Sequence, residues 1–188
     1  MASQVGICNR ALQKLGASPI TSLDDGTTVA NALSAAYDPV RLALLRSYTW
    51  SFAIKRAELA ASASAPAFGY NNAFPLPADW VKMAPPDTPS QALDFVIEGK
   101  SISSNDSAPL QIRYVSDVTD VNQMDVLFRE ALACDLAHEL CELVTQSNTK
   151  KADLKNDKRD TILEARRTNA IEKPTKPAAL DSWVTVRR

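Results

Sequence analysis

The stretch between Trp50 and Val118 lacks the helical periodicity found on either side of it, and this contrast limits the possible folds most. Short runs rich in β-branched or aromatic residues alternate there with Pro, Gly, Asn and Ser. Glu98-Gly99-Lys100 predicts a hairpin turn, and residues 60–67 and 84–90 predict loops. We expect a small, mostly antiparallel β unit. Its predicted strands are Ser51–Arg56, Trp80–Met83, Ala92–Ile97, Ser101–Ser103 and Leu110–Val115.

Two helices are expected before this β unit. Ser3 is a suitable N-cap for the first, and Gly16 a suitable C-terminal stop. The second helix is expected to begin near Thr27 or Thr28 and to fade at Tyr48. Pro39 lies inside it and predicts a kink or break near Asp38, because proline lacks the backbone donor and clashes with the preceding turn.

Helical periodicity returns from Met124 to Thr145, where the chain has its strongest apolar pattern. The residues of this face are Leu127, Phe128, Ala131, Leu132, Leu136, Leu140 and Leu143. After Ser147-Asn148 a more polar helix is expected to about Ala170. Its thin apolar side consists of Leu154, Ile162 and Ala165.

The order of these elements predicts an α+β fold. We expect an antiparallel bundle of about four helices, with an inserted antiparallel β unit and an extended C-terminal arm. The predicted bundle comprises residues 1–50 and 118–172, the β-rich insertion residues 51–117, and the arm residues 173–188.

Composition excludes some classes of function and leaves others open. The chain has 188 residues, a net charge of -1 and 45% hydrophobic residues, which suits a globular protein with no bulk attraction to nucleic acid or to an anionic membrane. No apolar stretch approaches the ~20 residues that span a bilayer. No secretory signal is expected at the N-terminus, and three cysteines inside helical patterns favour free thiols in a reducing cytoplasm.

Cys134, His138 and Cys141 form the strongest candidate for chemistry, because they lie four and three residues apart on one side of a helix and are zinc-ligand types. The chain has one histidine, and no second pair of ligands exists for the usual zinc geometries. We therefore expect thiols packed between helices, no metal and no cofactor. Without a nucleotide-binding loop or nucleophile elbow, we expect no enzyme. A metal-dependent enzyme centred on His138 remains a third hypothesis.

The fourth helix carries a basic group interleaved with acidic residues. One interpretation makes Lys151, Lys155 and Lys158 a surface for contact with DNA. The other, which the mixed charges favour, is a solvated helix with ion pairs between successive turns. A DNA-binding or packaging accessory protein using this helix is the alternative function. Arg166-Arg167 add positive charge that could meet an acidic partner surface or DNA phosphates.

The C-terminal arm follows a proline-broken segment and carries apolar and basic residues without a core of their own. We expect it to order on a neighbouring chain, with Trp183 as the anchor. A strap folded back on its own subunit, or disorder, is the competing interpretation. The predicted contact residues are Leu180, Trp183, Val184, Val186, Arg187 and Arg188.

Several short sequence motifs, here called strings, follow one another in a defined order over residues 5–147. The chain carries Asn9-x-Ala11-Leu12-x-x-Leu15-Gly16, Ile20-x-Ser22-Leu23-Asp24-Asp25, Tyr37-Asp38-Pro39-Val40-Arg41-x-x-Leu44-Leu45-Arg46, Trp50-Ser51-Phe52-Ala53-x-Lys55-Arg56-Ala57-x-Leu59-Ala60, Phe74-x-Leu76-Pro77-x-Asp79-Trp80, Phe95-Val96-Ile97-Glu98-Gly99-Lys100, Ile112-Arg113-Tyr114 and Leu127-Phe128-x-Glu130-Ala131-Leu132-Ala133. In order and spacing these strings resemble the tail tubular protein A family, the head-to-tail adaptors of short-tailed phages.

This resemblance implies a virion protein that is assembled in the host cytoplasm. It implies a ring of about twelve copies that takes the portal on one side and the tail tube or nozzle on the other. Genomic DNA would pass through the lumen without sequence-specific binding, and no membrane is involved. The family motifs assign no catalytic or ligand residues, and residues after 147 match in character alone.

Overall fold

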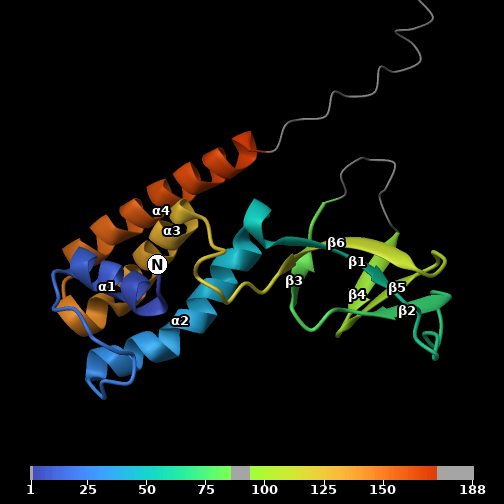
Figure 1. Cartoon of the computed structure of the whole chain (residues 1–188), viewed down its shortest axis with the longest axis horizontal. Coiled ribbons are helices and arrows are strands. Elements are labelled where there is room, and N and C mark those ends of the chain that lie inside the picture. The colour runs from blue at the N-terminus through green and yellow to red at the C-terminus, as the bar shows by residue number, and fades with distance from the viewer. Residues whose placement is uncertain (1, 86–93, 173–188) are drawn as a thin grey trace, which may run out of the picture.

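The computed structural model describes residues 2–85 and 94–172, so the expected arm lies outside the described residues. Figure 1 shows the helices gathered on one side and the strands on the other. This arrangement confirms the α+β class. In chain order the elements are α1 (Gln4–Leu15), α2 (Thr28–Ser47), a 3-10 turn (Ser51–Ala53), β1 (Ile54–Leu59), β2 (Asn72–Pro75), β3 (Trp80–Met83), β4 (Phe95–Glu98), β5 (Ser101–Ser104), β6 (Leu110–Ser116), α3 (Val126–Thr145) and α4 (Asn148–Ile171).

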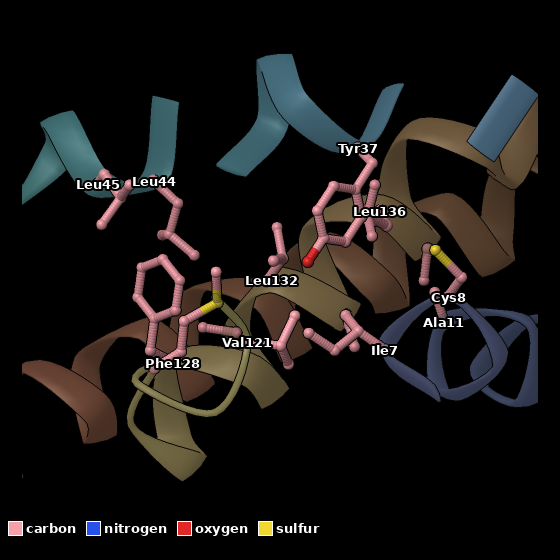
Figure 2. Packing of buried hydrophobic residues seen from close by; sticks show 14 of the residues in the cluster. Ile7, Cys8, Ala11, Tyr37, Leu44, Leu45, Val121, Phe128, Leu132 and Leu136 are labelled. Carbon is pink, nitrogen blue, oxygen red and sulfur yellow. The ribbon is translucent and has the colours of Figure 1, made fainter. Parts of the chain in front are cut away.

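Helix α3 is the centre of the helical part, because it packs against α1, α2 and α4. Every residue from 131 to 137 is buried, so the helix is covered on all sides over two turns. Figure 2 shows Leu132 and Leu136 of α3 among side chains from α1 and α2. The predicted apolar face is correct for most of its length, but Leu143 is 47% exposed. Leu143 lies two turns beyond Leu136 on the same face of α3, past the stretch of buried residues.

The predicted helix caps are present. The hydroxyl of Ser3 accepts a hydrogen bond from the backbone N–H of Gly6, and Gly16 ends α1 with a left-handed φ of 74° that disfavours other residues. Between α3 and α4, Gln146 also adopts a left-handed conformation, and the hydroxyl of Ser147 caps α4. This short connection makes α3 and α4 an antiparallel pair.

Of the kink or break predicted near Asp38, the break does not occur, since α2 continues through Pro39 as one helix. Tyr37 and Leu44, on either side of the proline, both belong to the same core. Arg41 lies between them and is only 3% exposed, with its guanidinium paired to Asp38 and Asp117. Tertiary packing on both sides therefore offsets the lost helical hydrogen bond.

The strands form two antiparallel sheets of three strands each, in the orders β1-β6-β3 and β2-β5-β4. The predicted hairpin is present: Glu98 pairs with Ser101, and Gly99 has a φ of 59° at the first turn position. A second hydrophobic cluster involves both sheets. Its buried members are Leu59, Phe74, Ile102, Leu110, Ile112 and Tyr114.

Two details of the β unit differ from the expected strands. Residues 51–53 form a turn, because the N–H of Ser51 donates to Asn169 of α4 and the carbonyl of Ala53 accepts from Ser116. The strand then begins at Ile54. Strand β2 was not predicted, because four residues with one buried phenylalanine and a terminal proline give little pattern; it exists by pairing at the edge with β5.

Strand β6 connects the β unit to the helices. Val115, together with Val81 of β3, belongs to the helical core, whereas Tyr114 belongs to the second cluster. The two cores therefore lie on opposite faces of the same strand. The division into domains at residues 51 and 117 stays a prediction. No helix of the described part has the length and hydropathy needed to cross a membrane.

Two buried tyrosines provide a matched test of this packing. Tyr37 is 3% exposed and its hydroxyl has no hydrogen-bond partner, whereas the hydroxyl of Tyr114 donates to Asp79 over 3.0 Å. We expect Tyr37→Phe to leave the free energy of unfolding unchanged or slightly raised, and Tyr114→Phe to lower it by about 1 kcal/mol, since it removes a made hydrogen bond. Urea unfolding of both variants measures this.

Equal losses in the two variants would contradict this assignment, because they would mean that the hydroxyl of Tyr37 has an acceptor after all. A folded circular-dichroism spectrum for both variants is the control.

Candidate functional site

The residues predicted to contact partners fall into two groups. Leu180, Trp183, Val184, Val186, Arg187 and Arg188 lie outside the described residues. The three lysines proposed to meet DNA lie on α4, the helix that packs against α3.

Two of these lysines are engaged within the subunit. Lys151 pairs with Glu142 of α3, and Lys158 Nζ lies 3.4 Å from Asp135 Oδ1. Lys155 is exposed, and no described carboxylate pairs with it. Because α3 and α4 run antiparallel, Glu142 and Asp135, two turns apart on α3, face Lys151 and Lys158, two turns apart on α4. These pairs join α4 to α3, whereas the sequence had favoured ion pairs between successive turns of α4 itself.

Asp135 is the most unusual charge of this interface. It is 9% exposed, and burial raises the pKa of its carboxyl despite the nearby Lys158. The contact with Lys158 lacks hydrogen-bond geometry, so Oδ1 remains without a donor. Desolvation therefore outweighs the ion pair at this position.

Cys134, His138 and Cys141 do share one side of α3, but the structure gives each thiol a local neighbour. Cys134 Sγ lies 3.6 Å from the hydroxyl of Thr161, and Cys141 Sγ lies 3.3 Å from that of Thr145. Both thiols are buried. Burial and the charges of Lys158 and Lys151 lower the pKa of His138.

Among residues 2–85 and 94–172, no group of three His, Cys, Asp or Glu side chains is placed to hold a metal ion. A surface depression of about 470 Å³ lies over α1. The residues that line it include no carboxylate, histidine or cysteine. Its walls are Gly6, Asn9, Arg10, Gln13, Ala17 and Pro19. Arg10 is itself bound to Glu130 of α3.

The structure reveals a third group of charged residues that the sequence did not predict. Arg46 at the end of α2, Lys82 of β3 and Arg166 of α4 gather where the helices meet the β unit, and we call them the junction cluster. The sequence drew attention to Arg166 only as a neighbour of Arg167. Spacing could not have revealed the set, because its members come from three distant segments.

Replacing Asp135 tests the balance between desolvation and ion pairing. Its folded-state pKa lies above the ordinary 3.8, so the native protein holds this proton more tightly than the unfolded chain and loses stability as the pH rises through that range. We expect Asp135→Asn to raise the urea midpoint at neutral pH. The gain should disappear below the ordinary aspartate pKa.

Asp153→Asn, the same change at an exposed position of α4, is the control and should leave the midpoint unchanged. A lower midpoint for Asp135→Asn at neutral pH would show instead that the pair with Lys158 stabilises the fold.

Neither a scan against protein-family models nor a search of the curated proteins finds a match for this chain.

Proposed function

We propose that this protein is the head-to-tail adaptor subunit of a tailed phage. In this role copies of the chain form a ring beneath the portal, join it to the tail tube or nozzle, and let DNA pass through the lumen of the virion. The observation that carries the proposal is the ordered series of strings over residues 5–147 that resembles the tail tubular protein A family.

Contacts between these strings support the proposal, because residues from different strings meet in the fold. The side chain of Asn9 exchanges two hydrogen bonds with the backbone of Ile20, each of 2.9 Å. Lys55 pairs with Asp79 over 2.7 Å, and Asp79 also accepts from Tyr114.

Within a single string, Asp38 pairs with Arg41, and Arg41 also donates to the carbonyl of Val118 over 2.8 Å. What the strings share is thus the framework that holds the helices and the β unit together. A framework of this kind suits a subunit whose task is mechanical, since a ring under load needs fixed faces and no reactive group.

Exposed apolar side chains give such a ring something to bury. A ring subunit uses two different faces, one for each neighbour. Ile171 at the end of α4 is 83% exposed, Val126 at the start of α3 66%, and Phe68 in the loop after β1 88%. These residues are far more accessible than the core and are the candidates for contact between subunits.

The alternative, a packaging factor that binds DNA through α4, has less support. Its surface would need unpaired cations, but Lys151 and Lys158 are paired to carboxylates of α3. With a net charge of -1 overall, the chain offers little electrostatic attraction to a duplex.

The first test is the mass of the assembly. We expect the purified protein, mixed with the portal protein encoded in the same genome, to form a ring complex with a fixed number of copies, measured by native mass spectrometry. The protein alone provides the reference. A mixture in which portal and protein remain separate would contradict the adaptor role.

The second test concerns the arm. We expect deletion of residues 174–188 to weaken binding to the portal or to the neighbouring subunit, and Trp183→Ala to reproduce a large part of the loss, because a buried tryptophan commonly dominates an interface. Co-sedimentation with portal rings measures the first contact and mass the second. Unchanged binding in both assays would refute a docking role for the arm.

A further inference from the structure

The junction cluster brings three cations together from three separate elements. Arg46 Nη1 donates to the carbonyl of Val81, which places its guanidinium beside Lys82 on the neighbouring position of β3. Arg166 Nη2 lies 3.3 Å from the hydroxyl of Ser47, at the end of α2. Figure 1 shows that α2 and α4 both end on the side of the helical part that faces the strands.

Aromatic rings fix the two guanidinium groups of this cluster. The guanidinium carbon of Arg46 lies 5.9 Å from the ring centroid of Trp80, and that of Arg166 lies 5.2 Å from the ring of Tyr48. Each contact is a cation–π interaction. One flat face of each guanidinium is thus covered. Arg46 is exposed, which leaves N–H groups along its edge open to a ligand, whereas Nε of Arg166 is buried.

Among the described residues the cluster has no acidic partner, in contrast to several other cations of the chain. Arg10, Lys14, Arg41 and Lys55 all pair with carboxylates. Within the described part of the chain, no carboxylate forms an ion pair with Arg46, Lys82 or Arg166. Burial lowers the pKa of Lys82, and the positive charges of Arg166 and Arg46 lower it further.

Hydrogen-bonding capacity at the cluster is also incompletely used. Trp80 Nε1 and Arg166 Nε are both buried, and neither has an acceptor among the described residues. Buried donors without acceptors cost free energy, and so do like charges held close together. The subunit itself covers these two donors, so an anion docked at the cluster would relieve the repulsion between the cations and would not reach the buried donors.

We propose that the junction cluster is a docking site for a carboxylate-bearing segment of a protein partner. Arginine, tryptophan and tyrosine are the residues most enriched at the energetic centres of protein interfaces. A carboxylate can accept two parallel hydrogen bonds from the free edge of a guanidinium. This inference stands on the cluster itself and does not depend on the adaptor role.

Duplex DNA fits this site less well. A duplex presents phosphates in a long row and is bound by cations spread along that row. The three cations here converge on one place. The lysines that could extend the row along α4 are mostly paired with α3.

An oligoglutamate peptide with a fluorescent label is the probe for this proposal, used with the full-length chain in anisotropy titrations. We expect Arg46→Gln, Lys82→Gln and Arg166→Gln each to weaken peptide binding about tenfold, because each removes one charged contact. Lys155→Gln, the same change of charge at an exposed position of α4, is the matched control and should bind like the wild type.

Stability separates lost binding from lost folding. Lys82→Gln removes repulsion within the cluster, so its urea midpoint should equal or exceed that of the wild type while its peptide binding falls. Loss of binding with an unchanged or raised midpoint supports the docking site.

Three results would overturn the proposal. The first is an absence of peptide binding to the wild-type chain, and the second is an equal loss in Lys155→Gln. The third is a short DNA duplex that binds through the cluster while the peptide does not, which would make it a phosphate site.

Discussion

Trp50 occupies the position on which the rest of this structure depends. Its indole is 1% exposed and packs edge-on against Phe128, with ring centroids 5.1 Å apart, while its Nε1 donates to the carbonyl of Leu44 over 3.0 Å. Phe52 adds a third ring, 5.0 Å from Phe128. One side chain thus joins the end of α2, the entry to the β unit and the start of α3. Aromatic contacts of this kind fix direction as well as burying area.

The return of the chain to the helices is held by a different interaction. Arg41 of α2 is buried, pairs with Asp117 and donates to the carbonyl of Val118, directly after β6. Because both crossings between helices and strands are tied to α2, the β unit has little freedom to turn relative to the helices. A buried guanidinium is costly to desolvate, and here three acceptors compensate it. For a ring subunit, such ties would keep two binding faces at a constant angle.

The charged surface has two parts, one in which cations are paired with carboxylates and one in which they are not. Between α3 and α4, the antiparallel register brings Lys151 to Glu142 and Lys158 to Asp135, so the helix that looked most basic is largely neutral toward a partner. At the junction of helices and strands, Arg46 and Arg166 instead stack on aromatic rings, and no carboxylate among the described residues pairs with them. The sequence pointed to the first group, because its residues follow one another along one helix.

Local signals in the sequence determined the elements whose cause is itself local. Ser3 and Gly16 bound α1, Gly99 supplies the hairpin turn, and the apolar face of 124–145 marks the central helix, since caps, turns and periodicity act within a few residues. Tertiary structure decided what depends on distant partners. Packing on both sides of Pro39 kept α2 continuous, Asn169 held residues 51–53 in a turn, and pairing with β5 made a strand of 72–75. The junction cluster belongs to this second class, because only folding brings α2, β3 and α4 together.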